Sequence, residues 1–161
     1  MFKHLKQTID ESIQLELNIS DLYTIFNQVF REDAYFWWTL SEEEERHAEL
    51  IRKAGRIEIL PDGIASEMLC PELQDIIDTN NKIVSFIDKY KLNPPSREEA
   101  FNVALEIEQS AGEMHFQEFM ENSSDNILFQ LFQKLNKDDK DHYARISSYM
   151  EEHGIQNLTD S

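Results

Sequence analysis

The chain has 161 residues, of which 32 are Asp or Glu and 15 are Lys or Arg, and its formal net charge is -17 at pH 7. A surface with this charge repels phosphate backbones and anionic lipid headgroups, which argues against nucleic acid and membrane surfaces as partners. The length fits one domain with a sizeable core, and the small number of Gly and Pro residues, four of each, favours helices over sheet.

The only cysteine is Cys70, which cannot form a disulfide framework or a four-cysteine iron site. A reducing, cytoplasmic compartment is therefore expected. The amino terminus lacks the apolar segment of a signal peptide, and no apolar run approaches the roughly 18 residues that span a bilayer.

Hydrophobic periodicity predicts five helices. Residues 2–30 carry apolar side chains at alternating steps of three and four, which indicates a long first helix. A second helix is expected over residues 33–54, with Gly55 as its end. Residues 56–70 contain Pro61-Asp62-Gly63 and are expected to form a loop.

The third helix is expected to begin near Pro71 and to end before Asn93-Pro94-Pro95, because Pro suits a first helical turn and interrupts a helix elsewhere. Ser96-x-x-Glu99 is a capping-box pattern that predicts the start of a fourth helix, expected to reach about Glu121. Residues 122–125 read as a turn and cap before a fifth helix, which Gly154 closes.

The spacing of the helices predicts one all-α domain over residues 1–161. Short connections suggest antiparallel helical hairpins over residues 2–54 and 96–153. The crossover between them, residues 55–95, contains the additional helix, and residues 154–161 form a short tail. A ferritin-like four-helix bundle is the simplest architecture of this kind, and an irregular five-helix bundle without internal symmetry is the alternative.

Two acid-x-x-His pairs each follow a lone glutamate. Glu16 precedes Glu44-x-x-His47 by 28 residues, and Glu108 precedes Asp139-x-x-His142 by 31. In so acidic a chain roughly one acid-x-x-His pair is expected by chance, so the pairs alone prove little. A solvated or salt-bridged acid, or a hydrogen-bonded histidine, remains an alternative for each residue taken singly.

The position of each acid on its helix is more informative than the spacing. Glu44 shares a face with apolar residues, whereas Glu45 lies among charged ones. Glu108 is likewise on an apolar face, and Glu16 is in the middle of an apolar stripe. Asp139 also lies on such a stripe.

These stripes carry no Lys or Arg that could neutralise the acids. Burying an isolated carboxylate costs several kcal/mol, so metal cations are the simplest compensation. Carboxylates and imidazoles together suit iron or manganese better than a metal that prefers thiols. The predicted ligands are Glu16, Glu44, His47, Glu108, Asp139 and His142, with Asp138 as a reserve candidate.

Tyr23 and His115 each lie seven residues after a lone glutamate, a separation of two helical turns. This separation is too long for either to share a metal with that glutamate. Core packing is one interpretation for both, and hydrogen bonding to the ligands or proton delivery is the other.

The combined pattern of Glu16-x6-Tyr23, Glu44-x-x-His47, Glu108-x6-His115 and Asp139-x-x-His142 resembles the ferritin-like di-iron carboxylate proteins, and the rubrerythrin branch most closely. The resemblance covers about residues 2–154. It implies that Glu44 and Asp139 bridge two iron ions, in a site that manganese or zinc could also occupy. Glu16 with His47, and Glu108 with His142, would complete the ligand set.

Three features depart from the rubrerythrin pattern. Asp139 stands where the family usually has Glu, and Ala111 stands where rubrerythrins carry a further glutamate. A rubredoxin module needs four cysteines and Cys70 is alone, so none is expected in this chain, and electrons would come from an external electron-donor protein.

The resemblance implies an oxidoreductase that reduces hydrogen peroxide or dioxygen. A homodimer is expected from the aromatic residues of the first hairpin and from the frequency of such dimers. One alternative is a ferritin-type protein that oxidises, stores or hands on iron, and that would form a large hollow assembly. The other alternative is a metal-free helical scaffold that binds a partner.

Overall fold

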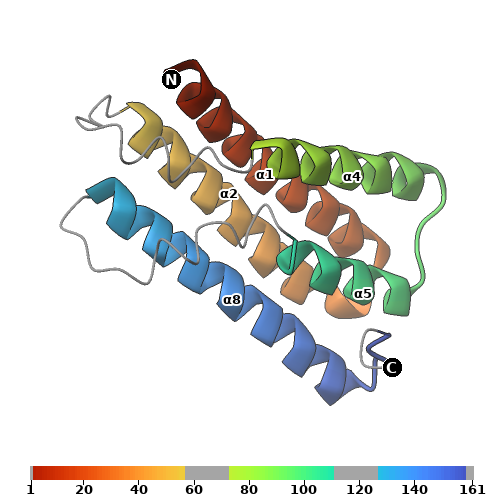
Figure 1. Cartoon of the computed structure of the whole chain (residues 1–161). Helices are drawn as coiled ribbons and strands as arrows, with labels where there is room; N and C mark the ends of the chain where they lie inside the picture. Colours follow the sequence, from red (N-terminus) through yellow and green to blue (C-terminus); the bar gives the residue numbers. More distant parts are fainter. Residues whose placement is uncertain (1, 57–72, 111–126, 159–161) are drawn as a thin grey trace.

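The computed structural model of the chain describes residues 2–56, 73–110 and 127–158 (Figure 1). Within these ranges it contains five α-helices, one short 3-10 helix and no strand, which confirms the all-α class for this part of the chain. None of the described helices has the length and apolar character needed to cross a membrane. The elements are α1 (Phe2–Val29), η1 (Arg31–Asp33), α2 (Ala34–Arg56), α4 (Leu73–Leu92), α5 (Arg97–Glu108) and α8 (Ile127–His153).

The first three expected helices are present with small shifts at their ends. α1 matches the helix expected over residues 2–30, and α2 continues through Gly55 to Arg56 instead of ending before it. α4 begins at Leu73 in the structure and ends just before Asn93. The rest of the loop expected over residues 56–70 lies outside the described residues.

α5 begins as its sequence predicts but is shorter than expected. The hydroxyl of Ser96 accepts a hydrogen bond from the Glu99 amide at 3.1 Å, which confirms the cap. The helix ends at Glu108, and the Ser110 amide bonds back only three residues, to the Ile107 carbonyl. Residues 111–121 of the expected extension lie outside the described residues. A tightened turn of this kind commonly ends a helix.

The end of α8 confirms the role expected of Gly154. This glycine has a φ of 65°, in the left-handed region that residues with a Cβ rarely adopt. The next amide, that of Ile155, then bonds to the Met150 carbonyl at 2.9 Å and satisfies one of the free carbonyls at the helix end.

Four helix pairs make the main contacts among the described elements: α1 with α2, α1 with α4, α2 with α8, and α5 with α8. Figure 1 shows α2 between α1 and α8. Polar side chains hold α4 on α1, since buried Asn80 accepts a hydrogen bond from Asn18 and donates to the carbonyl and carboxylate of Glu11. The other four α-helices, α1, α2, α5 and α8, carry the residues of the candidate site.

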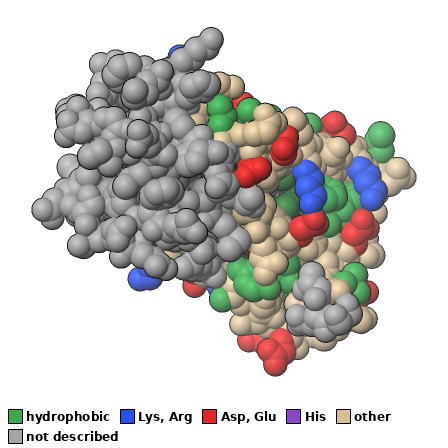
Figure 2. Space-filling model, in the orientation of Figure 1, with side chains coloured by type: hydrophobic (Ala, Val, Ile, Leu, Met, Phe, Trp, Pro, Cys, Tyr) green, Lys and Arg blue, Asp and Glu red, His purple; other side chains and the backbone are tan. Residues whose placement is uncertain are grey.

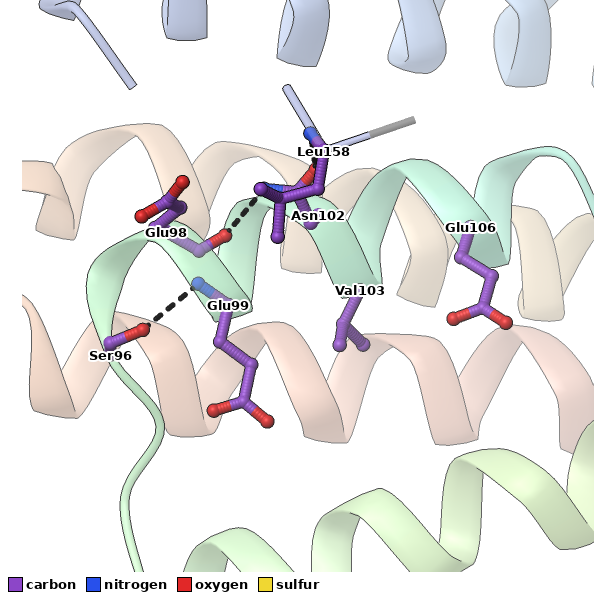
Figure 3. Close-up of a pocket in the computed structure, with 7 residues that line it drawn as sticks. All are labelled: Ser96, Glu98, Glu99, Asn102, Val103, Glu106 and Leu158. Atoms are coloured by element: carbon purple, nitrogen blue, oxygen red, sulfur yellow. Dashed lines mark hydrogen bonds between the residues drawn. The ribbon is translucent and has the colours of Figure 1, made fainter. Parts of the chain in front are cut away.

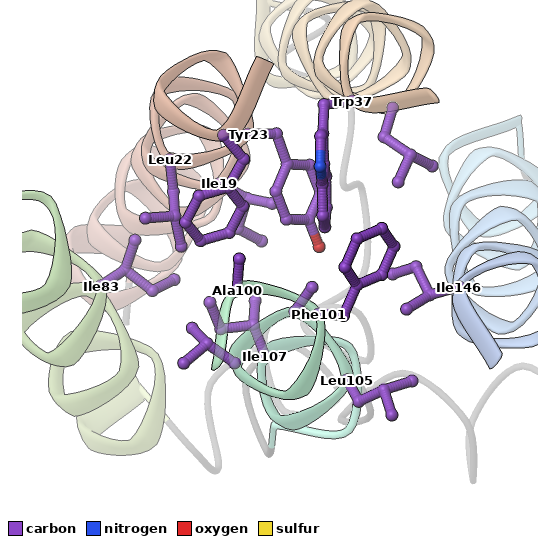
Figure 4. Packing of buried hydrophobic residues seen from close by; sticks show 14 of the residues in the cluster. Ile19, Leu22, Tyr23, Trp37, Ile83, Ala100, Phe101, Leu105, Ile107 and Ile146 are labelled. Atoms are coloured by element: carbon purple, nitrogen blue, oxygen red, sulfur yellow. The ribbon is translucent and has the colours of Figure 1, made fainter. Parts of the chain in front are cut away.

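The apolar core is rich in aromatic rings. Figure 4 shows Tyr23, Trp37 and Phe101 packed together between helices, with Ile19 and Ile146 nearby. All five side chains are completely buried. Rings of this size bury large apolar areas, and tilted contacts between them add to the stability of the core.

One buried carboxylate ties three helices together. Asp33, in the turn between α1 and α2, accepts hydrogen bonds from Arg97 Nε and Nη2 of α5 at 2.8 and 2.7 Å. It also accepts one from the Tyr149 hydroxyl of α8 at 2.8 Å. Because Asp33 is buried, its charge depends on these partners for compensation.

This geometry predicts a large cost for removing Arg97. The Arg97→Met substitution, which retains much of the aliphatic stem, should lower the free energy of unfolding by about 3 kcal/mol, since it leaves a buried carboxylate without its counter-charge. Denaturant titration measures the change.

Arg52→Met is the matched control, because the side chains of Arg52 and its partner Glu49 are 40% and 45% exposed, whereas Asp33 is buried. Surface pairs of this kind contribute about 1 kcal/mol or less. Equal losses in the two variants would contradict the structural role assigned to Asp33 and Arg97.

Candidate metal centre

Five of the six predicted ligands lie on the buried face of their helices, and the side chain of the sixth, Asp139, is outside what the structure describes. Glu44 is completely buried on α2 while Glu45 is exposed, as the pattern of apolar neighbours predicts. On α5 the same contrast separates buried Glu108 from exposed Glu106. Glu16 of α1, His47 of α2 and His142 of α8 are also buried.

These five side chains form two groups that could hold a metal ion. Glu16, Glu44 and His47 bring one nitrogen and two oxygen atoms within 4.8 Å of one another, and Glu44, Glu108 and His142 do the same. The imidazole rings of the two groups are stacked, with centroids 5.5 Å apart. Glu44 belongs to both groups.

The two oxygens of Glu44 face different histidines. Its Oε2 lies 3.3 Å from His47 Nδ1, and its Oε1 lies 2.9 Å from His142 Nδ1. The remaining acids complete the groups, since Glu16 Oε2 is 3.8 Å from His47 Nδ1 and Glu108 Oε1 is 3.7 Å from His142 Nδ1. A carboxylate placed in this way has the arrangement needed to bridge two cations.

Several inward-facing atoms of the second group lack an aligned hydrogen bond from any described residue. They are Glu44 Oε1, Glu108 Oε2 and His142 Nδ1. Glu44 Oε1 and His142 Nδ1 lie close together, but their geometry does not make a hydrogen bond. A buried polar atom without a partner costs about 1–3 kcal/mol, whereas a cation between these atoms would engage all of them. The donor set therefore fits a metal ion.

The charges of these groups depend on one another. Burial alone would raise the pKa of Glu44, but the nearby His142 charge and contacts with Glu16 and His47 hold it well below its ordinary value. Burial alone would lower the pKa of His47, but Glu16 and Glu44 raise it to about 11. The pKa of His142 is likewise raised, against the effect of burial, chiefly by the charge of Glu44. Without a metal, protons would thus supply the positive charge that the carboxylates require.

The outer nitrogen of each histidine faces an acid from the opposite helix. His47 Nε2 of α2 lies 3.2 Å from Asp138 Oδ2 of α8, and His142 Nε2 of α8 lies 3.4 Å from Glu43 Oε2 of α2. Arg145 Nη1 donates to both oxygens of Glu43, at 2.9 and 2.8 Å. Although burial alone would raise the pKa of Glu43, His142 and Arg145 lower it to about 2. Acids on the outer nitrogens hold each ring with Nδ1 directed inward.

Glu43 was not among the residues predicted from the sequence, and Asp138 was only a reserve ligand. Both residues immediately precede the acid of an acid-x-x-His pair, so the full pattern is acid-acid-x-x-His on α2 and again on α8. This repetition in the sequence could have indicated that Glu43 and Asp138 have equivalent roles. The structure places Asp138 beside His47, on the nitrogen that faces away from Glu44.

The other predicted residues have different outcomes. Tyr23 is buried, and its hydroxyl donates to Glu108 Oε1 at 2.7 Å, so it both packs in the core and holds a candidate ligand. Asp139 lies on α8, but its side chain is outside what the structure describes. His115 and Ala111 also lie outside the described residues, and their roles stay predictions.

The acidic surface does not form a second candidate site in the described residues. A pocket of about 550 Å³ on α5 is lined by three acids together with Ser96, Asn102, Val103 and Leu158 (Figure 3). Glu99 pairs with Lys89 and Glu106 with Lys82, so two of its acids already have counter-charges. Figure 2 shows basic side chains directly beside acidic ones on the described part of this face.

No protein-family model, curated protein or solved structure matches the chain. The resemblance to ferritin-like proteins that the sequence pattern suggests therefore stays a prediction.

The outer acids provide a direct test of how the histidines are held. Asp138→Asn and Glu43→Gln should each weaken metal binding by about 10–100-fold, the usual effect of removing a carboxylate behind a ligating histidine. Competition with a metal-binding dye measures the affinity.

Asp141→Asn and Glu42→Gln are controls, because both residues are exposed neighbours on the same two helices. The controls should bind metal as the unaltered chain does. If all four variants lose affinity equally, general surface charge rather than the orientation of the rings would explain the effect.

Proposed function

We propose that this chain is a rubrerythrin-like dinuclear-metal oxidoreductase, which reduces hydrogen peroxide or dioxygen with electrons from an external donor. In this proposal α1, α2, α5 and α8 are the four helices of a ferritin-like bundle, and α4 belongs to the crossover. The chain would bind two ions, because its acids and histidines form two groups that meet at one carboxylate.

The observation that carries the proposal is the position of Glu44. Its two oxygens face His47 and His142 separately, and each histidine has a further buried glutamate beside it. A hydrogen-bonded structural core needs no such duplication of acids around one fully buried carboxylate. Two cations that share Glu44 would explain the duplication.

The protein side chains would bind, orient and shield the metals. Glu16 and His47 would hold one ion, and Glu108 and His142 the other. Iron, when bound, would supply the electrons for peroxide reduction. The Tyr23 hydroxyl, which donates to Glu108 Oε1, orients that carboxylate and places a proton at the edge of the second group.

The ligand set favours iron or manganese, since hard carboxylate oxygens outnumber the imidazole nitrogens. Zinc remains compatible with the same atoms. Asp139 is proposed as the second bridging acid, and a homodimer as the assembly. A large hollow assembly would instead favour the storage and handling of iron.

Metal loading tests the proposal. The chain should bind about two ferrous ions under anaerobic conditions, and peroxide should oxidise them. Glu44→Ala should remove most of this binding, because both groups lose a ligand. Glu108→Ala should impair one group more than the other. Metal analysis and the absorbance of the oxidised centre provide the readouts.

Glu45→Ala is the matched control, since Glu45 is adjacent to Glu44 but exposed. This variant should load and react as the unaltered chain does. Retention of less than one metal per chain by the unaltered protein would support the metal-free scaffold instead. Equal binding by the Glu44 and Glu45 variants would show that the ligand assignment is wrong.

A further inference from the structure

A series of aromatic rings leads from the candidate metal centre toward the surface. It begins at Tyr23, whose hydroxyl donates to Glu108, and the Tyr23 ring centroid lies 5.4 Å from that of Trp37. Phe36 lies 5.2 Å from Trp37 and 4.1 Å from Tyr149 between ring centroids. Figure 4 shows the buried part of the series, with the rings of Tyr23 and Trp37 side by side.

A second ring joins the same two residues. Phe101 lies 4.5 Å from Trp37 and 5.5 Å from Tyr149 between centroids. One phenyl ring thus separates Trp37 from Tyr149 along either route. Electron tunnelling weakens steeply with distance, so closely packed rings between two oxidisable side chains favour transfer between them.

The two ends of the series differ in exposure. Tyr23 and Trp37 are completely buried, whereas Tyr149 is only half-buried. Tyr149 also lines a shallow surface pocket of about 280 Å³ beside Arg145 and Ser148. A small solute can therefore approach the outer end but not the inner one.

The proton partners of Trp37 and Tyr149 also differ. The indole nitrogen of Trp37 is buried and has no hydrogen-bond partner among the described residues, so an oxidised Trp37 would keep its proton and remain a strong oxidant. The Tyr149 hydroxyl donates to Asp33 at 2.8 Å, and burial together with this bond raises the pKa of Tyr149 to about 12. Tyr149 must lose its proton when it is oxidised, and Asp33 is aligned to receive it.

We propose that Tyr23, Trp37 and Tyr149 form a redox chain that carries single oxidising equivalents from the metal centre to the surface, where a soluble thiol removes them. The inference depends on the proposed function, because the oxidant is hydrogen peroxide reacting at that centre. The redox chain would protect the protein core from oxidation when peroxide removes more electrons than the bound metals can supply.

Each transfer moves one electron inward. With iron bound, the centre would draw one electron from Tyr23, whose hydroxyl proton would move to Glu108 Oε1 and return when Trp37 reduces Tyr23. Tyr149 would then reduce Trp37, which would leave a neutral phenoxyl radical on Tyr149 and its proton on Asp33. A thiolate then gives one electron to Tyr149, and Asp33 returns the proton. Two thiolates oxidised in this way form a disulfide and supply the two electrons that, with two protons, convert one peroxide to two waters.

Flash photolysis tests the outer half of the chain without any reaction at iron. The 161-residue chain is loaded with zinc, which has no redox chemistry. In a Tyr23→Phe/Trp38→Phe background, Trp37 is the remaining tryptophan and can be photo-oxidised selectively. The indole radical should decay as a tyrosyl radical forms, and Tyr149→Phe should remove most of the tyrosyl signal.

Tyr143→Phe is the matched control, because Tyr143 is half-buried on the same helix but outside the ring series. It should leave the transfer unchanged. The inference is overturned if no tyrosyl radical forms in the background protein, or if the radical forms in equal yield without Tyr149. Circular dichroism verifies that each variant is folded.

Peroxide provides the second arm, with the ferrous-loaded, unaltered chain and a spin trap. Peptide mass spectrometry should find the trap on Tyr149 rather than on Tyr23 or Trp37, and a trap confined to the buried residues would also overturn the inference. If the protein does not consume peroxide at all, the proposed function fails, while the photolysis result still decides whether the ring series transfers electrons.

Discussion

The arrangement of the described helices depends on a carboxylate that is completely removed from water. Glu44 lies between His47 and His142, and both histidines contact it through Nδ1. An isolated buried carboxylate is strongly unfavourable, so positive charge has to be present on both sides of it. Two further glutamates, Glu16 and Glu108, increase this requirement. Metal cations between these side chains would meet this requirement, and the proposed function is based on that possibility.

An acid on each of two helices fixes the orientation of the histidine ring on the other helix. α2 supplies Glu43 to the His142 ring of α8, and α8 supplies Asp138 to the His47 ring of α2. Neither ring can turn its outer nitrogen inward without losing a charged partner. At the far end of the same helices, Asp33 forms an ion pair with Arg97 and accepts a hydrogen bond from Tyr149. This one carboxylate therefore positions both α5 and α8.

Much of the fold and centre could be predicted from periodicity alone. Adjacent residues point in different directions on a helix, and this difference is enough to separate buried Glu44 from exposed Glu45. The partners of Glu43 and Asp138 could not be predicted in this way, because each contact joins two helices far apart in the chain. The end of α5 at Glu108 was also not predicted, because it depends on backbone hydrogen bonds at residues 109 and 110 that hydrophobic periodicity does not show. The part played by the Asp139 side chain stays a prediction.

Anomalous X-ray diffraction from crystals of the manganese- or iron-loaded protein tests the central claim most directly. The account predicts two strong peaks that share the Glu44 carboxylate, one beside Glu16 and His47 and the other beside Glu108 and His142. Data collected at the absorption edge of each metal would identify the ions. Peaks confined to surface carboxylates, or a fully loaded crystal with no peak beside Glu44, would contradict the account.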